Sequence, residues 1–355
     1  MTVINGVEIG NISYIPNKVH QILATSHTKI SNMLNLPVIM VISNPCKYFR
    51  RYILAHEFIQ RMNKTPNIDL YIVELEYGNN PVFEVTEKNN PRHLQLHLPD
   101  TQPIWHKENM INMAVKHLLP VDWKMMAWID ADVEFESLTW VNDTITLLSD
   151  GNYDIVQLFS HAIDMDQNCD TMQIFSGFGY QYANNRKYGV AGINNYWHPG
   201  FAWACTRSAY DKMGGLYDTA ILGSGDNHMA LSWIGKCDNT TNNLSDGYKK
   251  SVRDYQERCY SSNIGFKIGY VPGVIRHFFH GSKKNRKYIE RRKILIEHNF
   301  DPNIHLTRLS TNSKFDGLLV PVQGLCPNEL LDDIMSYFKE RNEDEYFTYT
   351  SVQLN

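Results

Sequence analysis

The clearest chemical signal in the chain is a pair of carboxylates, Asp130 and Asp132, spaced by one small residue directly after an apolar run. In an open α/β sheet, ligands bind beyond the carboxyl ends of the strands, so both acids are expected at the mouth of a site. Two close carboxylates repel each other, and a divalent cation shared with phosphate oxygens relieves that repulsion. The pattern therefore favours Mg²⁺ or Mn²⁺. The alternative is that both aspartates stabilise the turn that follows.

Two imidazoles three residues apart, His277 and His280, form a second cluster after another apolar run. Neutral imidazole suits Mn²⁺ better than Mg²⁺ as a further protein ligand. Together with the two aspartates, these histidines favour manganese. The alternative is that one histidine packs in the core while the other is solvated.

A third segment, Gly223–Asp226, places one acid at the expected start of a helix. A helix N-terminus stabilises a carboxylate as an anion, which leaves Asp226 available as a general base for a hydroxyl group. An ordinary capping aspartate has the same features. Asp226 is therefore the candidate catalytic residue, and capping is its alternative.

Side chains suited to a nucleotide diphosphate occur in two upstream segments. A ring and a cation precede a predicted helix, and an Asn-Pro pair with an arginine follows the first predicted strand, so stacking and charge pairing are both available. The candidate nucleotide-binding residues are Asn44, Pro45, Arg51, Glu74, Trp105, Lys107, Asn109 and Asp130. An alternative is that these residues belong to ordinary helix starts on the surface.

An aromatic-rich turn at residues 196–203 is of the kind that stacks on sugar rings, although clustered aromatics also fill cores. With the glycine before Asp226, this turn supplies the candidate residues for binding an acceptor. They are Trp197, His198, Gly200, Trp203 and Gly225.

The segments between these motifs alternate apolar runs with helical periodicity, as in a βαβ sheet covered on both faces. Strands are expected at 38–42, 69–75, 124–129, 153–159, 202–205 and 264–271. Helices are expected at 49–62, 111–118, 208–213, 226–233, 246–261 and 329–340, with another beginning in the basic run 283–293. The Gly- and Asn-rich stretch 177–192 predicts a mobile loop.

Composition limits the classes of protein and partner. The 355 residues are 43% apolar, which suits one large domain, and the net charge of -4 gives no global attraction for nucleic acid. Six cysteines without CxxC pairs indicate neither a zinc framework nor a disulfide scaffold. The N-terminus lacks a signal-peptide pattern and no run reaches the ~20 apolar residues of a membrane span. We therefore expect a cytoplasmic protein with no transmembrane segment.

The order and spacing of these motifs over Pro37–Tyr288 resemble the GT-A glycosyltransferases, especially family-two-like bacterial and viral members. The resemblance to Golgi β-galactosyltransferases and polypeptide N-acetylgalactosaminyltransferases is more distant. In these enzymes a DxD motif follows a sheet strand, as Asp130 and Asp132 do. The galactosyltransferases have Gly-Gly-Glu-Asp at the acceptor, where Asp226 matches and the Glu does not. Their strand-end metal histidine resembles His280, with His277 as second choice, and their Phe-Asn-Arg segment resembles Trp105–Lys107.

The resemblance implies an α/β, GT-A (Rossmann-like) single domain with a central mixed, mostly parallel sheet and a C-terminal helical appendage. Residues 1–36 would be an N-terminal extension, 37–300 the catalytic domain with halves 37–160 and 161–300, and 301–355 the appendage. Mn²⁺ or Mg²⁺, held by Asp132 and His280 with support from Asp130, would neutralise the leaving group of a UDP-linked sugar.

Asp226 would then activate a hydroxyl of a glycan or other acceptor, with inversion at the sugar carbon. Two alternatives stay open. A sugar-nucleotide nucleotidyltransferase would normally carry a Gly-rich basic loop near its N-terminus, and residues 1–37 contain none. A non-catalytic glycan-binding relative would keep the aromatics and lose the chemistry.

Overall fold

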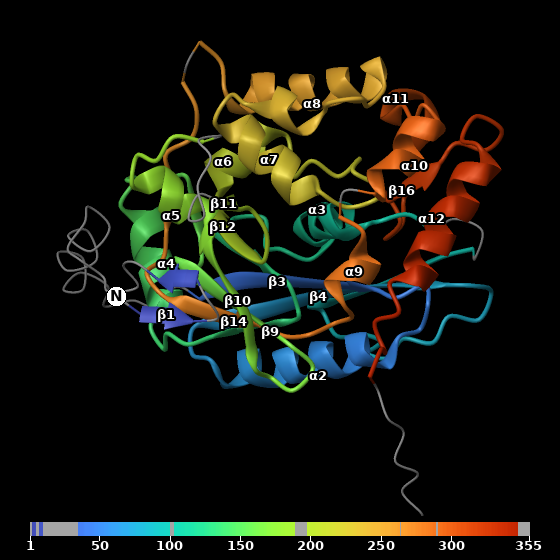
Figure 1. The fold of residues 1–355 in the computed structure, drawn as a ribbon. Helices are drawn as coiled ribbons and strands as arrows, with labels where there is room; N and C mark the ends of the chain where they lie inside the picture. The colour runs from blue at the N-terminus through green and yellow to red at the C-terminus, as the bar shows by residue number, and fades with distance from the viewer. Residues whose placement is uncertain are drawn as a thin grey trace, which may run out of the picture.

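A seven-stranded mixed sheet lies at the centre of the folded molecule (Figure 1). The computed structural model describes residues 35–99, 103–188, 197–262, 264–288 and 290–346, together with the backbone of 2–4 and 7–9. The strand order is β13 (Ile268–Tyr270), β8 (Ile155–Gln157), β12 (Ala202–Thr206), β6 (Met125–Ile129), β3 (Leu36–Ser43), β4 (Ile68–Tyr77) and β5 (His93–Leu98). Neighbours are parallel except β12, which runs antiparallel to both β8 and β6. The expected α/β class with a mixed, mostly parallel sheet is confirmed.

The central strands read as continuous apolar runs because both faces of the sheet are covered. Helix α2 (Phe49–Lys64) buries Ala55, Phe58 and Met62 in one core cluster, which also holds the side chains of alternate strand residues. Helix α3 (Lys107–His117) lies on the opposite face and packs into the other cluster (Figure 1). The sequence periodicities at these elements are confirmed.

A second sheet of five short strands adjoins the first, and none of its strands was predicted from the sequence. Its order is β11 (Trp197–His198), β10 (Thr171–Gly177), β9 (His161–Met165), β14 (Val274–His277) and β7 (Val133–Phe135). Strands of two to seven residues carry little periodicity, so their pairing depends on tertiary contacts. A separate hairpin pairs β1 (Thr2–Ile4) with β2 (Val7–Ile9).

The remaining elements lie mainly after these strands. Before residue 260 they are α4 (Trp140–Ser149), α5 (Phe178–Ala183), α6 (Arg207–Met213), α7 (Gly225–Trp233), a 3-10 turn η1 (Cys237–Thr240) and α8 (Asp246–Cys259). The C-terminal part comprises α9 (Lys283–Arg286), α10 (Arg292–Glu297), α11 (Pro302–His305), β15 (Leu306–Arg308), β16 (Leu319–Pro321) and α12 (Asn328–Glu340). The segment after residue 300 thus includes a two-stranded sheet besides helices. Helix α12 buries Leu330, Ile334 and Tyr337 in the same cluster as α3.

The predicted mobile loop at 177–192 is wrong for its first part. Residues 178–183 form α5, and the N–H of Gly179 donates to Gln157 Oε1 at 2.9 Å. A Cβ at Gly179 would lie 2.3 Å from the carbonyl oxygen of Gly269, so the glycine permits close packing of α5 on β13. Residues 189–196 lie outside the described part of the chain.

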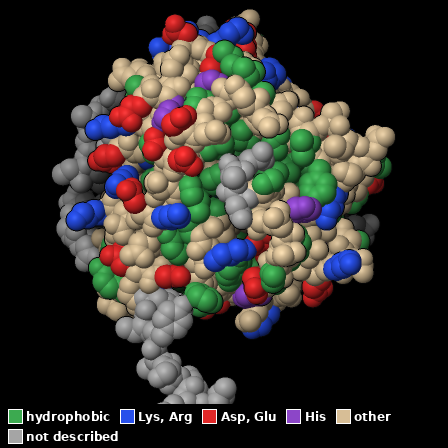
Figure 2. Space-filling model, turned by 90° about the vertical axis from the view of Figure 1, so that its right-hand side faces the viewer, with side chains coloured by type: hydrophobic (Ala, Val, Ile, Leu, Met, Phe, Trp, Pro, Cys, Tyr) green, Lys and Arg blue, Asp and Glu red, His purple; other side chains and the backbone are tan. Residues whose placement is uncertain are grey.

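On the face shown in Figure 2, acidic and basic side chains are interspersed and neither sign dominates. Within the described residues, no helix combines the length and the apolar character that crossing a bilayer requires.

Candidate functional site

One cavity of about 1070 Å³ opens at the carboxyl ends of β3 and β6. This is the edge at which an open α/β sheet binds its ligands. Most of the predicted site residues line it: Asn44, Pro45, Arg51, Trp105, Lys107, Asp130, Asp132, Trp197, His198, Gly200, Asp226, His277 and His280. The structure thus brings together motifs that are more than 200 residues apart in the chain.

Four predicted residues do not line the cavity. Glu74 is fully buried and accepts the N–H groups of Glu84 and Thr86, so it anchors a loop over β4. Asn109 is buried and donates to Asp218 at 3.0 Å. The Trp203 indole donates to the carbonyl of Pro199 at 2.7 Å.

Gly225 is the fourth, and it lies in the first turn of α7. A Cβ at this position would lie 2.6 Å from the carboxyl carbon of Glu108. The glycine therefore serves the close approach of α3 and α7.

Sheet register assembles the candidate metal cluster of Asp132, His277 and His280. Strand β7 begins directly after Asp132, and β14 ends at His277, which pairs with Val133 in antiparallel register. The Phe278 N–H then donates to the Asp132 carbonyl at 2.8 Å. Because β14 is a strand of its own rather than the end of β13, the sequence did not reveal this pairing.

The three side chains converge closely enough for one cation, since one ligand atom from each lies within 4.8 Å of the others. Asp132 Oδ2 lies 3.2 Å from His280 Nδ1 and 3.7 Å from His277 Nε2. The other oxygen, Asp132 Oδ1, is buried and has no hydrogen-bond partner among the residues that the structure describes. A buried carboxylate oxygen without a partner is costly, and a bound cation would satisfy it.

The electrostatics of this cluster suit a cation. Burial opposes ionisation of Asp132, but its contacts with His280 and His277 hold its pKa well below the usual range. Burial lowers the pKa of His280 to about 3, and neutral imidazole is the form that binds a metal. The pKa of His277 is raised because Asp132 and Asp164 outweigh the effect of its burial.

Asp164, on β9, orients His277 and was not predicted from the sequence. Its Oδ1 lies 2.6 Å from His277 Nδ1, which leaves Nε2 directed toward Asp132. A carboxylate on the second ring nitrogen is the usual support of a metal-binding histidine. Both His277 and His280 therefore have geometry suitable for a ligand.

Asp130 differs from Asp132 in its partner. It forms an ion pair with Lys107 at the start of α3, and its N–H donates to the carbonyl of Phe201 at 2.8 Å. Burial raises the pKa of Asp130 to about 6, against the lowering effect of Lys107. The neighbouring Glu108 is also buried, which raises its pKa to about 8. The structure thus separates the two aspartates of the motif, one paired with a lysine and one facing two histidines.

Asp226 lies at the second position of α7, and the N-cap is Ser224, whose φ of 74° is left-handed. Asp226 Oδ1 accepts the N–H of Asn227 at 2.8 Å, so it satisfies one donor of the first turn. A Cβ at Gly200 would lie 2.7 Å from Asp226 Oδ2. The glycine of the aromatic turn is therefore needed where the carboxylate approaches it, and Asp226 lines the cavity.

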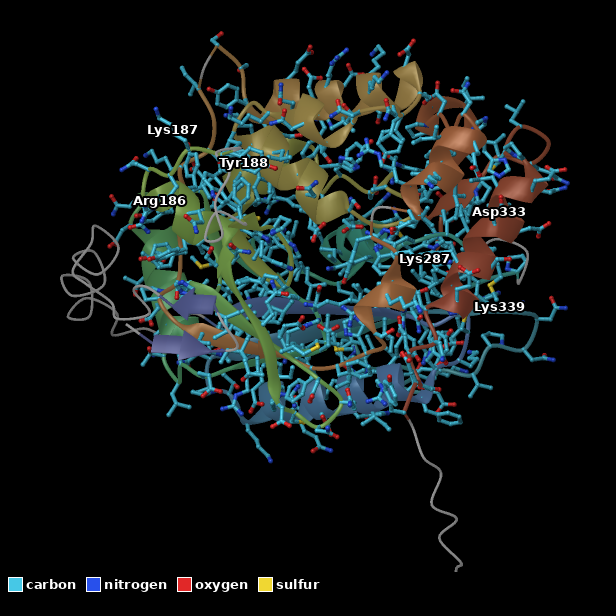
Figure 3. The ribbon with its side chains drawn as sticks, viewed as in Figure 1. Arg186, Lys187, Tyr188, Lys287, Asp333 and Lys339 are labelled. Atoms are coloured by element: carbon cyan, nitrogen blue, oxygen red, sulfur yellow. The ribbon has the colours of Figure 1, made fainter. Side chains whose placement is uncertain are left out.

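Aromatic side chains form one wall of the cavity. The rings of His198 and Phe201 stack at 4.0 Å, and Phe175 lies 5.1 Å from His198. Phe201 has a φ of 79°, a conformation that a bulky residue rarely adopts. Tyr188, labelled in Figure 3, packs edge-to-face on Trp197 at 5.3 Å.

Another part of the lining comes from the C-terminal segment, in which no site residue was predicted from the sequence. Glu343 is fully buried between Arg51 and Arg341. Arg51 also donates to the carbonyl of Ser43 at 2.6 Å. The Arg341 guanidinium lies 5.3 Å from the Trp105 ring. The nitrogens of Arg51 are thus engaged within the protein, and its predicted contact with a nucleotide stays a prediction.

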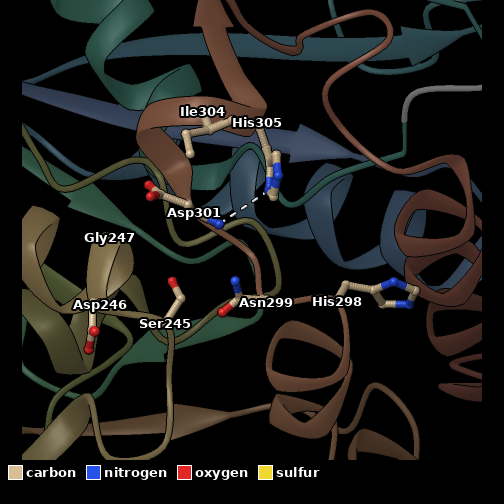
Figure 4. Close-up of a pocket in the computed structure, with 8 residues that line it drawn as sticks. All are labelled: Ser245, Asp246, Gly247, His298, Asn299, Asp301, Ile304 and His305. Atoms are coloured by element: carbon tan, nitrogen blue, oxygen red, sulfur yellow. Dashed lines mark hydrogen bonds between the residues drawn. The ribbon is translucent and has the colours of Figure 1, made fainter.

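Figure 4 shows a smaller cavity of about 380 Å³ between the starts of α8 and α11. The Asp301 N–H donates to His305 Nδ1 at 3.2 Å, and Asp301 Oδ1 accepts the N–H of Asn303. A Cβ at Gly247 would collide with the Asp301 carboxylate. These polar groups serve the junction of the two helices, and none of the predicted site residues lies here.

Comparison with known proteins adds no assignment. No protein-family model matches the chain, and no curated protein matches it. What bears on function is therefore the sheet, the large cavity and the side chains that line it.

Proposed function

We propose that the chain is a glycosyltransferase of the GT-A type that moves a sugar from a nucleoside-diphosphate donor, UDP-linked in our proposal, to a hydroxyl of a glycan or other acceptor. The observation that carries the proposal is the cluster of Asp132, His277 and His280 in the same cavity as Asp226. A cation site and a separate carboxylate at the carboxyl edge of a sheet are the two parts that this reaction needs.

The donor set fits Mn²⁺, with Mg²⁺ as the second choice. Carboxylate oxygen and two imidazole nitrogens suit a borderline ion better than a hard one, and Asp132 Oδ1 lacks any partner within the protein. When bound, the ion would neutralise charge on the diphosphate leaving group. Asp164 would hold His277 in the required tautomer.

Asp226 acts as the general base in this proposal. Its Oδ2 accepts the proton of the acceptor hydroxyl while the hydroxyl oxygen bonds to C1 of the sugar. The bond from C1 to the phosphate oxygen breaks, and the nucleoside diphosphate leaves with the electron pair. A single displacement of this kind inverts the configuration at C1.

The walls of the cavity would divide the two substrates. The ring of Trp105, backed by Arg341, offers a face for a nucleobase at the β3 end. The stacked rings of His198 and Phe201, with Phe175 beside them, offer an apolar face for a sugar. Gly200 keeps room for Asp226 between these regions.

The test is a panel of nucleotide sugars incubated with purified full-length protein, with and without Mn²⁺. We expect slow Mn²⁺-dependent release of nucleoside diphosphate from one donor, abolished by excess EDTA and restored by added Mn²⁺. Release of pyrophosphate from a nucleoside triphosphate and a sugar phosphate would instead identify a nucleotidyltransferase. Binding of glycans without turnover of any donor would identify a non-catalytic relative.

A further inference from the structure

Two buried arginines in the large cavity lack a carboxylate partner. Arg286, the last residue of α9, is 5% exposed, and Arg291 is 9% exposed. In contrast, the other cations that line the cavity are all paired: Arg51 and Arg341 with Glu343, Lys107 with Asp130, and Lys283 with Asp164. Within the described residues, the partners of Arg286 and Arg291 are neutral.

The hydrogen bonds of the two arginines leave much of their bonding capacity unused. Arg286 donates to the Tyr288 hydroxyl at 2.9 Å, and its Nε is buried without a partner. Arg291 donates to the Tyr337 hydroxyl and to Ser224 Oγ, each at 3.1 Å. The Tyr337 hydroxyl in turn donates to the Arg286 carbonyl at 2.9 Å, which couples the two positions.

An arginine cannot lose its proton in a protein, so a buried guanidinium without a carboxylate at ion-pair distance is unfavourable. Its planar fork matches the oxygens of a phosphate group better than any other side chain does. An anion that enters the cavity would therefore be attracted to these two positions, and phosphate is the group that their donors fit.

The location links this pair to both parts of the proposed site. Arg286 follows the metal cluster by six residues, and its charge helps to lower the pKa values of Asp132 and His280. Arg291 contacts the loop of the proposed base, because a Cβ at Gly223 would lie 3.1 Å from its guanidinium. A phosphate held here would adjoin the metal cluster.

We propose that Arg286 and Arg291 form a phosphate-binding site beside the Asp132, His277 and His280 cluster. The phosphate belongs either to the nucleoside diphosphate of the donor or to a phosphorylated acceptor. Assigning it to the donor rests on the proposed function, whereas the anion site stands on the two arginines alone.

The test is calorimetric titration with inorganic pyrophosphate and with UDP, each in the presence of Mn²⁺. We compare the wild type with Arg286→Met and Arg291→Gln. The matched control is Lys284→Gln, which removes a positive charge from an exposed neighbour outside the cavity. We expect each arginine variant to bind pyrophosphate about 10- to 100-fold more weakly, as for a lost charge-assisted hydrogen bond, and the control to stay within about twofold.

Unfolding temperatures distinguish ligand binding from a structural role. Replacement of an unpaired buried charge by an apolar side chain of similar length is neutral or stabilising, so Arg286→Met should not lower the unfolding midpoint of the ligand-free protein. A lower midpoint with unchanged pyrophosphate affinity would assign Arg286 to structure and overturn the proposal, as would a wild type that binds no pyrophosphate.

The ligands separate the possible outcomes. Competition between pyrophosphate and UDP, both weakened in the arginine variants, assigns the site to the donor. If UDP binds equally to all variants and only a phosphomonoester added to the UDP complex is weakened, the site belongs to an acceptor. Arginine-dependent binding of pyrophosphate without binding of any nucleotide would sink the proposed function but keep the anion site. If the wild type and all variants bound all these anions with equal affinity, the anion site would be overturned and the proposed function would stand.

Discussion

Two groups of charged side chains that line the cavity differ in how completely they satisfy one another. In the first group, Glu343 lies between Arg51 and Arg341, and the three side chains form a closed network. In the second group, Asp132 keeps a buried oxygen and Arg286 a buried nitrogen that find no hydrogen-bond partner among the described residues.

The difference separates charged residues that stabilise one another from those that a ligand could satisfy. Burying a charge is costly in both groups, but the Arg51, Glu343 and Arg341 network offsets that cost inside the protein. The unsatisfied atoms of Asp132 and Arg286 would attract an ion or a phosphate. Substitutions in the first group should therefore change stability, and substitutions in the second should change binding and turnover.

The largest expected effect is at Asp226. Asp226→Asn keeps the shape of the side chain but removes the acceptor for a proton, so turnover should fall by about 10²- to 10⁴-fold while donor affinity stays within a few fold. Asp246→Asn, which makes the same change in the first turn of α8, is the matched control and should leave turnover unaltered. Wild-type turnover in Asp226→Asn, or retention of the anomeric configuration in the product by NMR, would return Asp226 to a structural role.

The next effect concerns the closed network. Glu343→Gln removes the buried carboxylate that pairs with the half-buried Arg51 and the buried Arg341, and the free energy of unfolding should fall by about 3–5 kcal/mol in denaturant titration. Mn²⁺ affinity should stay within a few fold.

The control for that change is Glu340→Gln. It breaks the exposed ion pair with Lys287, beside α12 in Figure 3, and should cost about 1 kcal/mol or less. If both variants lose similar stability, or if Glu343→Gln mainly weakens Mn²⁺ binding, the contrast between the two groups of charged residues is wrong.

A smaller effect is expected where Asp164 supports His277. Asp164→Asn keeps an oxygen near His277 Nδ1 but removes the charge, and Mn²⁺ affinity should fall by about 10- to 100-fold. Asp170→Asn, at an exposed position near β10, provides the control. Equal Mn²⁺ affinity in calorimetric titrations of Asp164→Asn and the wild type would exclude the proposal that Asp164 orients His277 as a metal ligand.

The smallest expected effect is at Lys107. Because its ammonium is already paired with Asp130, Lys107→Ala should raise the donor dissociation constant by only about 3- to 10-fold, with a smaller change in turnover. Calorimetry with UDP and Mn²⁺ measures it. A loss of affinity beyond 100-fold would mean that Lys107, despite its partner, is a principal phosphate contact.

The sequence predicted the helices and strands that are marked by long segments of regular hydrophobic periodicity. The strands at 38–42 and 69–75 and the helices at 49–62 and 329–340 are all present, extended at their ends. The strand expected at 264–271 is shorter, and the basic run 283–293 forms the starts of two helices, α9 and α10, rather than one. Strand β5 was missed after the broken stretch that precedes it.

The candidate site was predicted where motifs are local and missed where partners are distant. Spacing in the sequence singles out Asp130, Asp132, His277 and His280. Packing, however, decides that Asp130 pairs with a lysine while Asp132 faces the histidines. Asp164 and Glu343 have no motif of their own. Their burial and their partners identify them, and neither can be read from neighbouring residues in the chain.

The pairing of β7 with β14 has a consequence for how the chain folds. It pairs Val133 with His277, 144 positions further along the chain, so it closes a long loop and is a contact of high sequence separation. In the proposed metal site, Mn²⁺ would bind the native cluster and not the separated strands, so added metal would stabilise the closed pairing by mass action. A metal-binding signal followed during refolding would therefore record the moment at which the two halves of the chain engage.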